Sequence, residues 1–228
     1  KYKIQYKQRK FKNYSDQINW TISNNPFKSK YIFRIDADEL INIKLVKELS
    51  ILLNKNFSGI FIKRHITFMG KLLKFGNQSE SFMLRLWKAG YGFCSNDLVD
   101  EQIIVKKGIL TKAENNITEV NLKPFKDFIK KHIKYAKLES NNYILNYNKN
   151  NNNHEYYSSN RKNKYNIYYK SPIFIRSILY FIFILILKFG YRDGFKGILF
   201  YLINCLCYRL LVDFNILSIK VLKKEING

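Results

Sequence analysis

Residues 31–39, with the sequence YIFRIDADE, constrain the fold more than any other stretch of the chain. Aromatic and β-branched residues fill most of its first half, which is typical of a strand buried on both faces. The segment ends in Asp36, Asp38 and Glu39. Because ligands bind at the carboxyl ends of strands in open α/β sheets, Asp36 and Asp38 would project toward a ligand. Two such carboxylates suit Mg²⁺ or Mn²⁺, with phosphate oxygens completing the shell. The alternative is an acidic helix N-terminus, which the helix dipole alone favours.

The elements around this stretch predict a mixed α/β fold. Leucines at helical spacing over residues 45–53 predict an amphipathic helix after the acidic segment. Strand patterns follow at 59–68, 81–87 and 99–106, with Gly70 and Gly76 bounding a hairpin around 71–74. Residues 125–139 predict a second amphipathic helix. Before the acidic segment, Ser15 offers an N-cap to a short helix that ends near residues 24–26.

The chain is strongly basic, with a formal net charge of +23 over 228 residues. An anionic partner is therefore expected, and nucleic acid, an anionic membrane surface and phosphorylated substrates all qualify. The three cysteines, Cys94, Cys205 and Cys207, have no spacing typical of a metal site or a disulfide framework, which fits a reducing compartment.

The C-terminal part divides into a polar tract and two apolar segments. Residues 141–164 are rich in Asn, Lys and Tyr and predict a polar linker or an irregular arm, with an exposed low-complexity loop as the alternative. The apolar run 177–187, bracketed by Arg176 and Lys188, is shorter than the roughly 20 residues of a spanning helix. A second apolar helix is expected over 198–212. The pair indicates an in-plane or hairpin membrane anchor, and a buried two-helix packing element is the alternative. We expect a catalytic domain at 1–140, a linker at 141–170 and a membrane-associating helical region at 171–228.

Further candidate residues lie outside the acidic segment. Asp100 and Glu101 belong to a second acidic cluster that begins at Asp97. A transfer reaction needs a carboxylate to deprotonate the acceptor hydroxyl, while a metal neutralises the departing diphosphate. The alternative is a solvated strand end facing nearby lysines. Arg85 lies inside a predicted strand, where a cation usually meets an anion, and diphosphate is the candidate.

The order of these pieces resembles a family 2 glycosyltransferase of the GT-A fold, a Rossmann-like mixed sheet with flanking helices. More narrowly, it is similar to the lipopolysaccharide core β-glycosyltransferase branch. The resemblance rests on residues 35–39, 82–87, 99–103 and 128–139, and on tail segments at 171–176, 190–194 and 208–213. Such enzymes begin with a nucleotide-binding strand and turn, so the chain resembles a member that lacks its first βαβ unit.

The resemblance implies specific roles. Asp36 and Asp38 would bind the divalent cation, Mg²⁺ or Mn²⁺, and the diphosphate of a nucleotide-sugar donor, with a uridine diphosphate sugar as the expected donor. Asp100, or Glu101 beside it, would be the base, and Arg85 would contact donor phosphate or acceptor. The acceptor would be lipopolysaccharide core or another lipid-linked glycan at the cytoplasmic face of the inner membrane.

Two readings from other classes stay open at this stage. The first is a non-catalytic basic protein that binds a membrane surface or nucleic acid, with aromatic residues among the lysines of residues 156–170 stacking on bases. Against it, the basic residues are spread along the chain and the acidic triplet has no purpose, so no nucleic-acid partner is expected. The second is an inactive, truncated glycosyltransferase.

Overall fold

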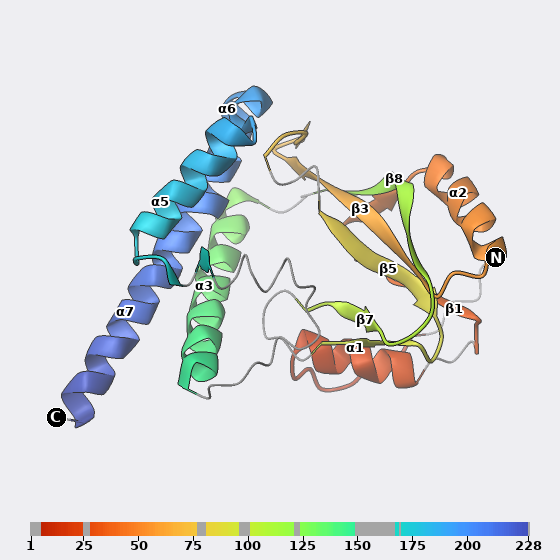
Figure 1. Cartoon of the computed structure of the whole chain (residues 1–228), viewed down its shortest axis with the longest axis horizontal. Helices are drawn as coiled ribbons and strands as arrows, with labels where there is room; N and C mark the ends of the chain where they lie inside the picture. Colours follow the sequence, from red (N-terminus) through yellow and green to blue (C-terminus); the bar gives the residue numbers. More distant parts are fainter. Residues whose placement is uncertain are drawn as a thin grey trace. The chain divides into compact units, whose positions relative to one another are not determined.

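The computed structural model describes residues 6–24, 28–76, 81–95, 101–120, 124–148, 167–168 and 170–227. They form a mixed α/β structure with a curled mixed sheet and a C-terminal apolar helix, as the sequence predicts (Figure 1). The chain divides into two compact units. One comprises residues 1–64 and 81–118, and the other comprises residues 65–80 and 119–228.

The main sheet has the strand order β1-β5-β3-β8-β2. Its strands are β1 (Tyr31–Phe33), β2 (Glu39–Ile41), β3 (Gly59–Phe68), β5 (Phe82–Lys88) and β8 (Leu110–Val120). Strand β5 pairs antiparallel with both β1 and β3. A hairpin follows β3 as the sequence predicts, but its turn lies at Met69 and Gly70, which both have positive φ, and not around residues 71–74. Lys71 and Leu72 form the returning strand, β4 (Lys71–Leu72), which pairs with the end of β3. Strands β6 (Gly92–Cys94) and β7 (Ile103–Val105) form a separate antiparallel pair.

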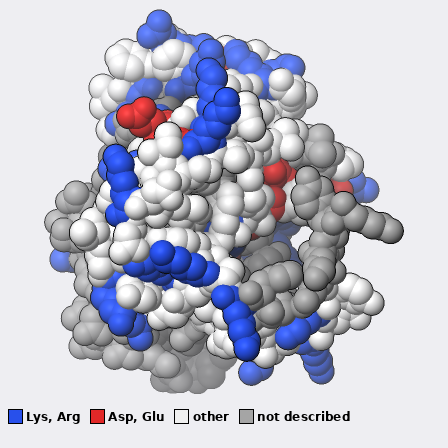
Figure 2. Space-filling model, turned by 90° about the vertical axis from the view of Figure 1, so that its right-hand side faces the viewer, with Lys and Arg blue, Asp and Glu red and all other residues white. Residues whose placement is uncertain are grey.

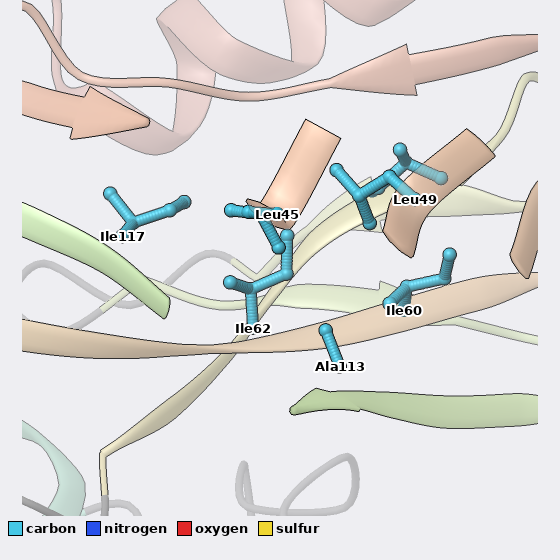
Figure 3. Packing of buried hydrophobic residues seen from close by; sticks show 7 residues of the cluster. Leu45, Leu49, Ile60, Ile62, Ala113 and Ile117 are labelled. Atoms are coloured by element: carbon cyan, nitrogen blue, oxygen red, sulfur yellow. The ribbon is translucent and has the colours of Figure 1, made fainter. Parts of the chain in front are cut away.

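Helix α2 (Ile43–Asn54) covers one face of the sheet. Asn42 caps it, since its side-chain oxygen accepts a hydrogen bond from the Leu45 backbone N–H at 2.7 Å. Leu45 and Leu49 point toward the sheet and pack on isoleucines of β3 (Figure 3). The whole cluster contains Leu45, Leu49, Ile60, Ile62, Leu86, Ala113 and Ile117. The helix and its buried face are thus the predicted ones.

Helix α1 (Tyr14–Ser23) packs through Ile18 and Ile22 against a second cluster that includes Leu84 and Trp87. The prediction that Ser15 caps this helix is wrong. The N-cap is Asn13, whose side chain accepts a hydrogen bond from the Asp16 backbone N–H at 2.8 Å. A residue two positions later lies inside the first turn, and Ser15 is accordingly buried there.

The second unit is mainly helical. Helix α3 (Phe125–Asn148) runs beside α7 (Tyr208–Asn227) and packs on it through Ala136, Val212 and Ile216 (Figure 1). Helix α5 (Ile175–Ile182) continues into a π-helical turn, η2 (Phe183–Leu187). After η3 (Gly190–Asp193), the helix comprises α6 (Gly194–Tyr201), the π-helical η4 (Leu202–Cys207) and α7.

Two C-terminal expectations need adjustment. Helix α3 continues to Asn148, so the first residues of the expected linker 141–170 are helical, and residues 149–166 lie outside the described ranges. The second apolar helix is also longer than the expected 198–212. Within the described residues, the segment Gly190–Leu222 is the one helix long and apolar enough to cross a membrane, judged by length and composition. Buried core helices can meet the same criterion, so its packing decides its role.

Candidate functional site

The acidic segment forms a loop between two strands. Strand β1 ends at Phe33 and is half-buried, whereas the sequence predicts a longer strand buried on both faces that ends in the acids. The reason is visible in the backbone. The Arg34 N–H donates to the Arg85 carbonyl at 2.8 Å, and the Glu39 N–H then closes a turn on the Asp36 carbonyl at 3.0 Å. The loop places Asp36 and Asp38 beyond the strand end, and Glu39 begins β2.

The side chain of Arg85, from strand β5, contacts the acids of this loop, and Arg85 is 1 % exposed. Its two terminal nitrogens donate to Asp36 Oδ2 at 3.3 and 3.2 Å, and one of them also donates to Glu39. The Glu39 side chain is fully buried and accepts a further hydrogen bond from the Asp36 backbone N–H at 3.0 Å. Diphosphate is the anion that the sequence predicts for Arg85, whereas in the structure two carboxylates of the chain itself meet it.

A β-bulge explains how Arg85 reaches these acids. Ile60 pairs with Leu86 and the next residue, Phe61, pairs with Leu84, so Arg85 is the extra residue of β5. The bulge shifts the alternation of side chains, and Leu84 and Leu86 consequently pack in different clusters on the two sides of the sheet. Bulges commonly re-aim one side chain next to functional sites. Here the bulge directs a guanidinium to the carboxylates of the loop.

Arg34 connects the loop to the second acidic cluster. Its Nε donates to Asp36 Oδ1 at 3.3 Å, and its Nη2 lies 3.5 Å from Glu101 Oε1. Its side chain retains 19 % exposure, far more than that of Arg85. The structure therefore brings together Asp36, Arg85 and Glu101 of the predicted site residues. Asp97 and Asp100, the preferred base, lie outside the described residues.

The surroundings shift the pKa values of two loop acids in opposite directions. Burial alone would raise the pKa of Asp36, but attraction to Arg85 and Arg34 outweighs burial and lowers it. Burial dominates for Glu39 and raises its pKa, although the Asp36 N–H and Arg85 oppose the shift. Asp36 is therefore the acid that stays anionic to lower pH, and Glu39 is the more readily protonated neighbour.

Asp36 and Asp38 have the chemistry to hold a divalent cation together with a phosphorylated ligand. Asp36 is anionic at neutral pH and partly exposed, and no hydrogen bond or ion pair joins Asp38 to another residue of the described ranges. In those same ranges no group of three or more His, Cys, Asp or Glu side chains is arranged to hold a metal ion. Mg²⁺ often takes only one or two carboxylates from the protein, with substrate phosphates and waters as the other ligands. A two-carboxylate site fits that pattern.

Sequence reasoning missed Arg34 and Glu39 as members of the cluster. A signal for Glu39 was present, because a buried cation such as Arg85 needs anionic partners and Glu39 is one of the few nearby acids. The role of Arg34 depends on the loop after Phe33, which strand periodicity does not predict.

Neither the protein-family models nor the curated proteins searched contain a match to this chain.

Proposed function

We propose that the full-length protein is a metal-dependent, inverting glycosyltransferase. It moves a sugar, with glucose as the first candidate, from a uridine diphosphate donor to lipopolysaccharide core or another lipid-linked glycan. The observation that carries this proposal is the cluster at the end of β1. There an anionic, partly exposed Asp36 is paired with two arginines, one of which reaches Glu101, and a partly exposed Asp38 follows two residues later in the loop.

In this proposal each side chain has a separate task. Asp38 and Asp36 would hold Mg²⁺ or Mn²⁺, and the bound cation would supply positive charge to the departing diphosphate. Arg85 is buried and holds Asp36 through an ion pair, while the more exposed Arg34 would meet phosphate oxygens. Asp100 or Glu101 would take the proton from the acceptor hydroxyl, which requires a carboxylate within hydrogen-bond reach of that group.

The basic surface supports an anionic acceptor. Lysine and arginine side chains are scattered over the face shown in Figure 2, and acidic side chains appear in only a few places. This distribution favours an extended anionic partner, such as a membrane surface carrying a glycolipid, over a ligand bound in one basic groove. We place the reaction at the cytoplasmic face of the inner membrane.

A turnover assay tests the proposal. Purified full-length protein, Mn²⁺ and a panel of nucleotide sugars are incubated with lipopolysaccharide-core acceptors, and the release of nucleoside diphosphate is measured. We expect release that needs both acceptor and metal, and a loss of at least about 100-fold in Asp38→Asn, the range that mutagenesis finds for removal of one strong electrostatic contact in a transition state. Asp127→Asn, on the exposed start of α3, is the matched control and should retain full activity. Undiminished turnover in Asp38→Asn would refute the metal role.

A further inference from the structure

We propose that the C-terminal helices bind an anionic lipid bilayer in the plane of its surface, through one apolar face, and do not span it. This inference concerns a surface of the helical unit and does not depend on the proposed transferase activity. It selects between the in-plane and spanning arrangements.

The first observation is the character of one helical face. The exposed positions of α5 and η2 recur at spacings of three and four residues, and each of them is apolar. We name this face the apolar stripe. Its residues are Ile175, Ile178, Leu179, Ile182, Phe183, Ile186 and Leu187. The opposite side of the same helix is packed inside the unit through Arg176, Ser177 and Ile184. An exposed apolar face of this extent marks an interaction surface.

The turn that follows the stripe has the composition of a membrane interface. Phe189, Tyr191 and Phe195 are 51 %, 51 % and 79 % exposed. Lys188, Arg192 and Lys196 alternate with them in the sequence. Aromatic rings and long cationic side chains favour the headgroup region, where the apolar part of each side chain contacts lipid and its polar end meets water or phosphate. With a net charge of +23, the chain matches a bilayer rich in anionic lipid as the occupant of this face.

The stripe itself is too short to cross a bilayer. The apolar helix Ile175–Leu187 would be only about 20 Å long at 1.5 Å per residue, whereas the hydrocarbon core is about 30 Å thick. A helix of this length with a strongly apolar face lies along the interface instead.

The longer helix, Gly190–Leu222, is prevented from spanning by its neighbour α3. Phe128 of α3 packs near Phe200, His132 Nε2 lies 2.6 Å from Asn204 Oδ1, and Ala136 packs on Val212. Helix α3 therefore accompanies the longer helix over most of its length. The exposed face of α3 carries five lysines, namely Lys126, Lys130, Lys131, Lys134 and Lys137. Burying each in the membrane core would cost about 2.5–3.5 kcal/mol on the translocon scale.

A buried ion pair fixes the stripe to the rest of the unit. Arg176 Nε donates to Asp213 Oδ1 at 2.8 Å, and the other carboxylate oxygen accepts from Ser177 Oγ at 2.7 Å and from the Phe174 N–H at 3.1 Å. Asp213 is fully buried, so its charge is compensated within the protein. Helix α5 is thus held on α7, and the stripe faces outward in a fixed orientation.

Vesicle sedimentation tests the docking. We compare binding of the full-length protein to vesicles of phosphatidylcholine alone and to vesicles with 30 % phosphatidylglycerol. We expect tighter binding to the anionic vesicles, and the difference should shrink at high salt because the headgroup attraction is screened. The double variant Leu179→Asp, Ile186→Asp should bind anionic vesicles at least about tenfold more weakly, since each charge resists insertion. The matched control Ile43→Asp, Ile51→Asp changes two equally exposed positions of α2 and should bind like the wild type.

A labelling experiment separates the in-plane arrangement from a span, and it needs no charged substitution in the stripe. In a Cys207→Ser background, the two other cysteines are buried. Lys188→Cys and Lys220→Cys are then probed on preformed anionic vesicles with a membrane-impermeant maleimide. Both positions should react from outside. Protection of one of them in intact but not in detergent-treated vesicles would overturn the proposal. Equal binding by the stripe variant and the wild type, or self-association through the stripe without lipid, would overturn it as well.

Discussion

At the scale of single residues, the most informative contact is the burial of Arg85 between Asp36 and Glu39. A guanidinium taken out of water is tolerated only when carboxylates and good geometry compensate the lost hydration. The Arg85 Nε has no hydrogen-bond partner within the described residues, so the two terminal nitrogens supply all of the recorded compensation. Removing the cation would leave Glu39 buried beside a second carboxylate.

We expect Arg85→Met to lower the free energy of unfolding by about 3–5 kcal/mol, the usual cost of breaking a buried ion pair. Arg9→Met is the matched control, because the Arg9–Asp16 pair is 25 % and 32 % exposed and should contribute less than about 1 kcal/mol. Urea denaturation of the two variants and the wild type measures both values. If both variants lose the same small amount of unfolding free energy, the Arg85 contacts stabilise the protein no more than a surface ion pair does.

The pKa shift of Asp36 gives a prediction for pH dependence. Its pKa is lowered in the folded state, so the ionised form stabilises the protein above the ordinary value of 3.8, and that stabilisation disappears as the pH falls through the lower folded value. Asp36→Asn should therefore be less stable than the wild type near pH 6, and the gap should close as the pH falls below 3.8. The contribution of Glu39 to stability changes with pH in the opposite direction. Its pKa is raised in the folded state, which favours the folded state at low pH. Denaturation curves across this range, with Asp127→Asn as control, measure the gap. If the difference in stability between Asp36→Asn and the wild type widens toward low pH, the pKa of Asp36 is not lowered in the folded state.

At the scale of elements, the helical unit depends on a buried carboxylate at the turn before α6. Asp193 is 2 % exposed. It accepts hydrogen bonds from the Lys74 and Phe75 backbone N–H groups at 3.0 and 3.1 Å, and from the Tyr201 hydroxyl at 2.6 Å. A side chain at Gly197 would collide with Asp193, since an added Cβ would lie 2.1 Å from the Asp193 Cβ. The segment after β4 is therefore tied to the start of the C-terminal helix.

Asp193→Ala should destabilise the protein by about 2–4 kcal/mol, because it leaves two buried backbone donors without an acceptor. The Tyr201 hydroxyl keeps the Phe75 carbonyl as an acceptor at 2.8 Å. Asp127→Ala, an exposed residue in the first turn of α3, should cost less than about 1 kcal/mol. Thermal and urea unfolding compare the two. Similar losses in both variants would mean that water replaces the Asp193 contacts at little cost.

The elements that sequence reasoning predicted are those with strong periodicity. Helix α2, strand β3 and the hairpin after it follow from leucine spacing, a β-branched run and Gly70 in the turn. The bulge at Arg85 could not be predicted, because it arises from pairing between β3 and β5 and leaves no mark in the spacing of β5 itself. The loop after Phe33 depends on the same bulge through the Arg34–Arg85 backbone bond. Asp36, Asp38 and Arg85 were found from the sequence, whereas the contacts of Arg34 and Glu39 needed the structure.

At the scale of the whole molecule, the positive charge and the apolar stripe favour the same kind of partner, an anionic lipid surface. The net charge of +23 favours anionic partners, and the apolar stripe favours a lipid surface. Asp36 and Asp38, the acids that would bind a cation, are few among the many basic residues. In the proposed function, a diphosphate attracted by the positive charge would still need the metal to bridge it to these two carboxylates.

Metal-dependent nucleotide binding tests this central claim most directly. Calorimetric titration of the full-length protein with uridine diphosphate is run with and without Mn²⁺, on the wild type, Asp38→Asn and the control Asp127→Asn. The account predicts binding that requires Mn²⁺, is lost in Asp38→Asn and is kept in the control. Binding of equal strength without metal, or in Asp38→Asn, would contradict it.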